Sequence, residues 1–71
     1  MESKPNGSLE FLTLYKKQAY EIMQDDTLSQ IDKRNYLHNI SKSALNNIYL
    51  SAEHYDILFK TLDIYKKTLN V

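Results

Sequence analysis

The sequence predicts an all-α fold, a small domain in which two shorter helices pack on a long C-terminal helix. The only Gly and the only Pro lie in the first seven residues, so little of the turn chemistry of tight β-hairpins is present. Apolar residues recur at intervals of three, four and seven, as they do along one side of an α-helix. Because 71 residues leave room for one core, we treat residues 1–71 as a single helical domain.

The long helix is predicted over residues 43–71, which contain neither Gly nor Pro. Ser41 or Ser43 can cap its start. Its main apolar row comprises Leu45, Ile48, Ala52, Tyr55, Phe59, Leu62 and Leu69. A second row, on about the opposite side of the helix, comprises Leu50, Ile57, Ile64 and Val71. Since a helix that is apolar on two sides must bury both, the second row is covered either by the other helices or by a partner molecule.

Two shorter helices are predicted before it. Residues 1–7 are polar and form a flexible lead-in, after which Ser8 is the expected N-cap of a helix that ends near Gln24. A second helix restarts after Asp25-Asp26-Thr27, where Thr27 and Gln30 fit a capping box. The apolar face of this second helix comprises Leu28, Ile31, Tyr36, Leu37 and Ile40.

Ion pairs within the long helix are also expected. Asp56 precedes Lys60, and Asp63 precedes Lys67, by four residues. Acid-before-base pairs at this spacing stabilise a helix by a few tenths of a kcal/mol each, about 0.2 to 0.5.

Composition narrows the function classes. Without cysteine the chain has no disulfide and no thiolate metal site, which suits a reducing cytoplasm. Nine basic and nine acidic residues give a net charge of zero, which disfavours independent DNA binding because phosphate neutralisation supplies much of that affinity. No apolar run approaches the roughly 18 residues of a membrane span, so we expect no membrane partner.

Catalytic motifs are not evident. His38 and His54 fit no metal-binding spacing, and the sequence has neither a nucleophile elbow nor a Gly-rich phosphate loop. We therefore expect no enzyme activity, no cofactor and no metal.

Several groups of residues leave two interpretations open. Most aromatic residues lie in or beside the apolar rows, which favours core packing over stacking on nucleic-acid bases. The pairs Lys16-Lys17 and Lys66-Lys67 are either solvated helix surface or contacts to a nucleic-acid backbone in a larger complex. Glu53 is either an ordinary surface carboxylate or the anchor of an incoming arginine, through a charge-assisted bidentate pair.

The stretch Tyr49-Leu-Ser-Ala-Glu-His54, followed by Phe59, Ile64-Tyr65 and Lys67, resembles the signature of the Hha/YmoA family. These are the haemolysin-expression-modulating proteins of enteric bacteria. The N-terminal part resembles the family in register at Met1, Lys4-Pro5, Glu10-Phe11-Leu12, Lys16-Lys17 and Asp26-Thr27-Leu28. The family has a further short helix after the position where this chain stops, at Val71, and a second contact acid where this chain has Ser29.

This resemblance implies a cytoplasmic, nucleoid-associated modulator of transcription. Such a protein binds the N-terminal dimerisation region of an H-NS-type nucleoid protein, alters silencing of AT-rich or horizontally acquired genes, and reaches DNA only through the complex. The resemblance assigns the arginine contact to Glu53 and a basic outer face to Lys16 and Lys17. Leu50, His54 and Ile57 are the other residues that we expect at the partner-binding surface.

A self-associating helical regulator is the alternative. In that case the row Leu50, Ile57 and Ile64 makes a homodimer, and the regulatory or inhibitory target is an unrelated protein.

Overall fold

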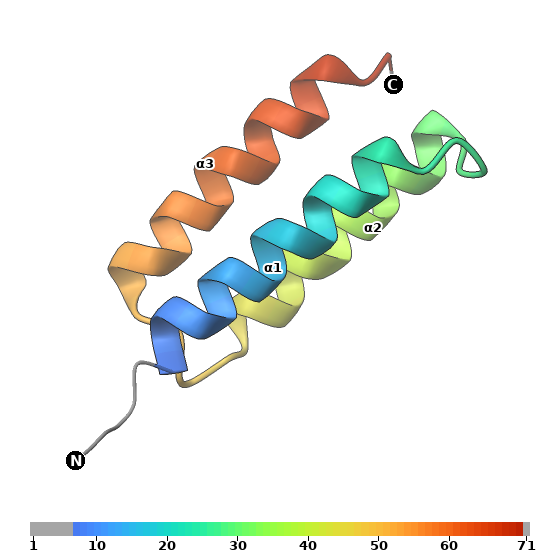
Figure 1. Cartoon of the computed structure of the whole chain (residues 1–71). Coiled ribbons are helices and arrows are strands. Elements are labelled where there is room, and N and C mark those ends of the chain that lie inside the picture. Colours follow the sequence, from blue (N-terminus) through green and yellow to red (C-terminus); the bar gives the residue numbers. More distant parts are fainter. Residues whose placement is uncertain (1–6, 71) are drawn as a thin grey trace.

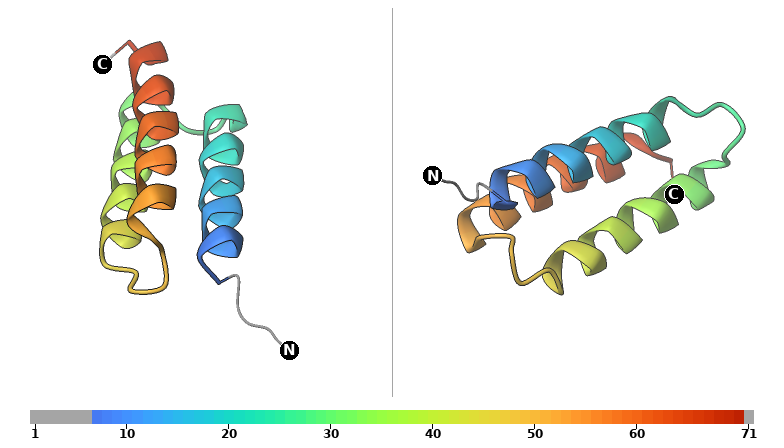
Figure 2. Two further views of the ribbon diagram at one scale, coloured as in Figure 1. Left: turned by 90° about the vertical axis from the view of Figure 1, so that its left-hand side faces the viewer. Right: turned by 60° about the horizontal axis from the view of Figure 1, so that its bottom comes forward.

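Three α-helices make up the computed structural model, which describes residues 7–70 (Figure 1). They are α1 (Gly7–Gln24), α2 (Gln30–Leu45) and α3 (Ala52–Thr68). The helices α1 and α3 point the same way and α2 runs in the opposite direction beside them, so that each helix contacts the other two (Figures 1 and 2). No strand occurs within residues 7–70, and the predicted all-α class is therefore confirmed.

The core lies along the line where the three helices meet. The largest fully buried side chains are Leu37 from α2 and Leu58 and Leu62 from α3. Removing such a side chain from water contributes about 1.5 to 3 kcal/mol. The full set of buried apolar residues is Leu12, Tyr15, Ala19, Leu37, Ile40, Ala44, Leu58, Leu62 and Leu69.

The predicted long helix over residues 43–71 is wrong. Helix α2 continues through Ser41 and Ser43 to Leu45, and the chain turns at residues 46–51 before α3 begins. The three helices have 18, 16 and 17 residues, so none of them is a long helix on which two shorter ones pack.

Two asparagines explain the break, Asn46 through its backbone and Asn47 through its side chain. Asn46 is the C-cap of α2, and the Asn47 side-chain oxygen accepts a hydrogen bond from the Tyr49 N–H at 2.9 Å. Asn competes in this way for backbone groups that a helix would otherwise use. The Ser51 side chain then caps α3 by accepting from the His54 N–H at 3.1 Å.

Two other predicted caps are also wrong. Ser8 lies inside α1, which begins at Gly7. The N-cap of α2 is Ser29, which accepts from the Asp32 N–H at 3.1 Å, whereas Thr27 donates from its hydroxyl and its N–H to Asp25. These hydrogen bonds lower the pKa of Asp25 below its ordinary value. The predicted end of the first helix at Gln24 is confirmed.

The buried stripe of α3 differs from both predicted rows. It includes Leu58, which neither row contains, together with Leu62 and Leu69. Leu45 and Ile48 precede α3 and are 68 % and 87 % exposed. On α2, Leu37 and Ile40 are buried as predicted, whereas Ile31 and Tyr36 are exposed.

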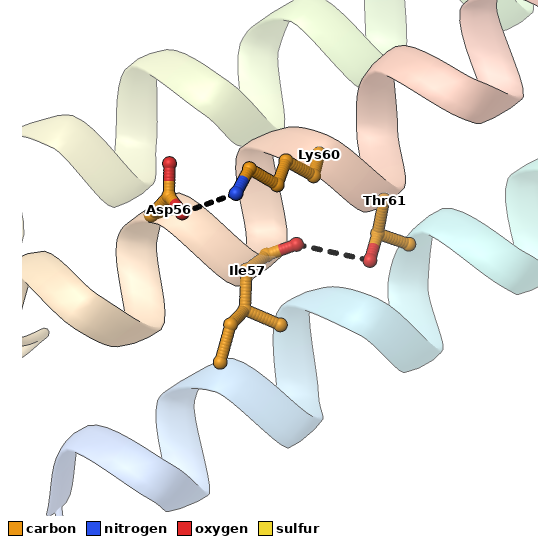
Figure 3. A network of polar contacts seen from close by, with 4 residues as sticks. All are labelled: Asp56, Ile57, Lys60 and Thr61. Atoms are coloured by element: carbon orange, nitrogen blue, oxygen red, sulfur yellow. Dashed lines mark hydrogen bonds and ion pairs between the residues drawn. The ribbon is translucent and has the colours of Figure 1, made fainter.

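The predicted ion pairs Asp56–Lys60 and Asp63–Lys67 are confirmed at 2.9 Å and 3.0 Å, and Figure 3 shows the first.

Polar contacts close both ends of the bundle. At the start of α1, the Ser8 hydroxyl oxygen accepts from the Ser51 N–H at 2.7 Å and lies 2.6 Å from His54 Nδ1. At the other end, the Gln30 side-chain oxygen accepts from the Asn70 N–H at 2.6 Å. Residues 1–6 of the predicted lead-in over residues 1–7 lie outside the described residues, as does Val71 of the second row. Gly7 does not belong to a flexible lead-in, because it is the first residue of α1.

We expect Ser8→Ala to destabilise the fold by about 1 to 2 kcal/mol, because it removes a hydroxyl that joins α1 to two groups at the start of α3. Urea unfolding followed by circular dichroism measures this. Thr13→Ala, on the exposed side of the same helix, is the control and should change stability by less than about 0.5 kcal/mol. Equal effects of the two substitutions would contradict a joining role for Ser8.

We expect Ser41→Ala to leave stability unchanged or raise it by about 1 kcal/mol. The Ser41 hydroxyl is buried and has no hydrogen-bond partner among residues 7–70. Replacing an unpaired buried hydroxyl with a methyl group removes a desolvation cost. Thr13→Ala, which removes an exposed hydroxyl from α1, is the control in thermal unfolding. A loss of more than about 1 kcal/mol in Ser41→Ala would show that this hydroxyl has a partner.

Candidate protein-binding surface

An apolar face lies along α1 and α3. It comprises Leu9 (51 % exposed), Tyr20 (56 %), Ile57 (42 %) and Ile64 (62 %). In Figure 3 the Ile57 side chain extends from α3 toward α1. Residues two apart on a helix point about 200° away from each other. Because Phe59 lines the groove between α2 and α3, Ile57 lies on the opposite flank of α3, beside α1. We call these four residues the α1–α3 face.

Helical spacing places Leu9 and Tyr20 on the same face. They are three turns apart on α1, whereas Tyr15 and Ile22 line the groove toward α2. The contact between Ser8 and His54 sets the levels of the two parallel helices, so that Leu9 lies near the level of Ile57.

Glu53 lies at one end of this face. It is exposed in the first turn of α3, one turn before Ile57, where the helix dipole stabilises a carboxylate. The nearby Lys60 pairs with Asp56 instead (Figure 3). No ion pair joins Glu53 to another residue within 7–70.

His54 and Leu50 lie elsewhere. His54 is half-buried, and its Nδ1 contacts the Ser8 hydroxyl, so it helps to hold α1 against α3. Leu50 is half-buried against the core and lines a groove with Ala44 and Tyr55, on the α2 side of α3. Of the four residues predicted at the partner-binding surface, the structure thus brings together Glu53 and Ile57 on one exposed face.

Lys16 and Lys17 are both exposed on α1. Lys16 lies two turns after Leu9 and borders the α1–α3 face, whereas Lys17 points about 100° away from it. The second lysine pair is divided as well. Lys66 lines the groove between α2 and α3, and Lys67 pairs with Asp63.

Two grooves with opposite charge flank α2, and neither was predicted. The groove between α1 and α2 has a volume of 430 Å³ and is lined by Glu21 and Asp25 but by no basic residue. The groove between α2 and α3 is lined by Arg34, Lys42 and Lys66. The spacing of Arg34, His38 and Lys42 at every fourth residue is the sequence signal for this basic edge.

Residues 7–70 contain no group of three or more His, Cys, Asp or Glu side chains that could hold a metal ion. His38 lies in the α2–α3 groove, apart from the contact between His54 and Ser8. None of the helices within residues 7–70 has the length and apolar character needed to cross a membrane.

Comparison with known proteins finds no matching family model, no matching curated protein and no matching solved structure.

We expect Ile64→Ser to change the free energy of unfolding by less than about 0.5 to 1 kcal/mol, since Ile64 is 62 % exposed. Leu62→Ala, two residues away and 1 % exposed, should cost about 2 to 5 kcal/mol. Urea unfolding of both variants measures which side of α3 faces the core. A large loss in Ile64→Ser would show that this face is covered rather than open.

Proposed function

We propose that this protein is a modulator of transcription that binds the N-terminal dimerisation region of an H-NS-type nucleoid protein. In this proposal it alters silencing of AT-rich or horizontally acquired genes, resides at the nucleoid in the cytoplasm, and touches DNA only as part of the complex. It acts by binding and performs no chemistry.

The observation that carries the proposal is the position of Glu53 beside the exposed Ile57. An arginine from a partner can make a bidentate, charge-assisted pair with this carboxylate while its neighbours cover the α1–α3 face. Apolar residues bordered by a charged group are typical of protein–protein interfaces. The resemblance of the Tyr49–His54 stretch to the Hha/YmoA family supplies the identity of the partner.

Ser29 stands where the family has a second contact acid, and here its side chain caps α2. The proposed contact with an arginine of the partner therefore depends on Glu53 alone. Lys16 and Lys17 supply the proposed outer-face contact to DNA once the partner is bound. A net charge of zero suits a protein that depends on a partner for DNA affinity.

Self-association is the second candidate function. The exposed Leu9, Tyr20, Ile57 and Ile64 favour it, because a second copy of the chain could cover the same face. Leu50 does not take part in this version, since it packs against the core.

We expect Glu53→Lys to weaken binding to an H-NS N-terminal fragment by about tenfold or more, because the substitution replaces an attraction to arginine with a repulsion. Isothermal titration calorimetry measures the change. Glu10→Lys is the matched control, since Glu10 is also an exposed acid in the first turn of a helix. It should leave affinity within about twofold of the parent protein.

Two results would overturn the proposal. One is the absence of measurable heat with any H-NS-type fragment. The other is a tight homodimer in sedimentation equilibrium that persists when such a fragment is added, which would favour self-association.

A further inference from the structure

We propose that the groove between α2 and α3 is a second docking surface, which binds an acidic amphipathic helix of another protein. This surface does not depend on the proposed function, because it lies on the other flank of α3 from Ile57.

Two neighbouring pockets that share His38 and Lys66 make up the groove along α2. Its first part is lined by Arg34, Asn35, His38 and Lys66 and has a volume of 240 Å³. The next part, of 310 Å³, shares His38 and Lys66 and continues to Leu45. From Arg34 to Leu45 the helix rises about 17 Å, at about 1.5 Å per residue, which is three turns. Such a length matches three turns of a helix laid along the groove.

Apolar side chains form the floor of the second part of the groove. Leu45 is 68 % exposed and Phe59 48 % exposed, and Phe59 stacks on the half-buried Tyr55 with ring centroids 6.2 Å apart. Covering exposed apolar surface contributes about 25 cal/mol per Å². Aliphatic and aromatic residues are mixed here, which suits the apolar side of a helix better than a row of nucleic-acid bases.

Positive charge surrounds this floor. Arg34, Lys42 and Lys66 line the groove, and none of the described residues that line it is acidic. This positive charge is a local excess, because the net charge of the whole chain is zero. Across α2, the groove toward α1 has the opposite character, with Glu21 and Asp25. The complementary ligand therefore carries acidic residues on either side of an apolar stripe.

A helix meets these requirements together. Two neighbouring helices of a bundle present a groove that accepts a further helix, whose residues at i, i+3, i+4 and i+7 occupy the apolar floor. Glutamates beside that stripe would reach Lys42 on α2 and Lys66 on α3.

The test uses the whole chain and two designed, fluorescein-labelled peptides of about 18 residues, enough for five helical turns. Both place leucines on one face; one has flanking glutamates and its twin has lysines at the same positions. We expect fluorescence anisotropy to show that the glutamate peptide binds about tenfold more tightly than its twin at low salt, with the difference reduced by added salt. Amide shifts in NMR spectra should map to residues of α2 and α3 that line the groove.

Matched charge reversals locate the site. Lys42→Glu/Lys66→Glu should weaken the glutamate peptide about tenfold, whereas Lys16→Glu/Lys17→Glu, with the same change of charge, should leave it within about twofold. Phe59→Ala, at an exposed position, tests the apolar floor without reversing charge and should also weaken binding.

Three outcomes would overturn the inference. They are equal affinities for the two peptides, shifts that map to Leu9, Tyr20 and Ile64 instead, and tighter binding of a single-stranded oligonucleotide of about 12 nucleotides than of the glutamate peptide. If the double reversal fails to fold, the peptide preference and the Phe59→Ala variant decide the matter alone.

Discussion

The chain reversal at residues 46–51 is the constraint on which the rest of the structure depends. Asn47 holds it through three contacts: its side-chain oxygen accepts from the Tyr49 N–H, its carbonyl from the Leu50 N–H, and its side-chain nitrogen donates to the Tyr15 hydroxyl at 3.0 Å. Phe11 stacks on both Tyr15 and Tyr49, with centroids 6.2 Å apart in each case. The turn is therefore fixed against α1 by polar and aromatic contacts together, and it decides where α3 begins.

The position at which α3 begins decides which residues are exposed for binding on each of its flanks. Ser51 caps α3 and donates its N–H to Ser8, so α1 and α3 run in parallel from a common end. Glu53 and Ile57 are then presented on one flank of α3, and Phe59 and Lys66 on the other. A domain of this size buries only about 60 % of the surface that its unfolded chain exposes. Apolar side chains therefore remain exposed on both flanks of α3, where a partner can cover them without a change in the core.

Much of the fold was predictable from local pattern. The helical class, the end of the first helix at Gln24 and both ion pairs of α3 depend on spacing within a few residues, which the sequence displays directly. The prediction of one long helix over residues 43–71 depends on the apolar spacing and on the absence of Gly and Pro from that stretch. Asn46-Asn47 followed by Ser51 carries the missing signal, since Asn ends helices and Ser starts them. Glu53 was identified as a candidate contact, and its exposed place beside Ile57 is compatible with that role.

The sequence by itself determined that this protein is helical, because periodicity is a property of neighbouring residues. Only the tertiary structure decided which apolar residues form the core. Leu58 is buried and Phe59 half-exposed because contact with α1 and α2 sets the rotation of α3, and a one-residue change in that rotation moves every side chain by about 100°. The same rotation decided that Leu50 and His54 are held within the fold, and that Arg34, Lys42 and Lys66 meet along one groove. Those contacts join residues that are far apart in the chain, so no local sequence pattern predicts them.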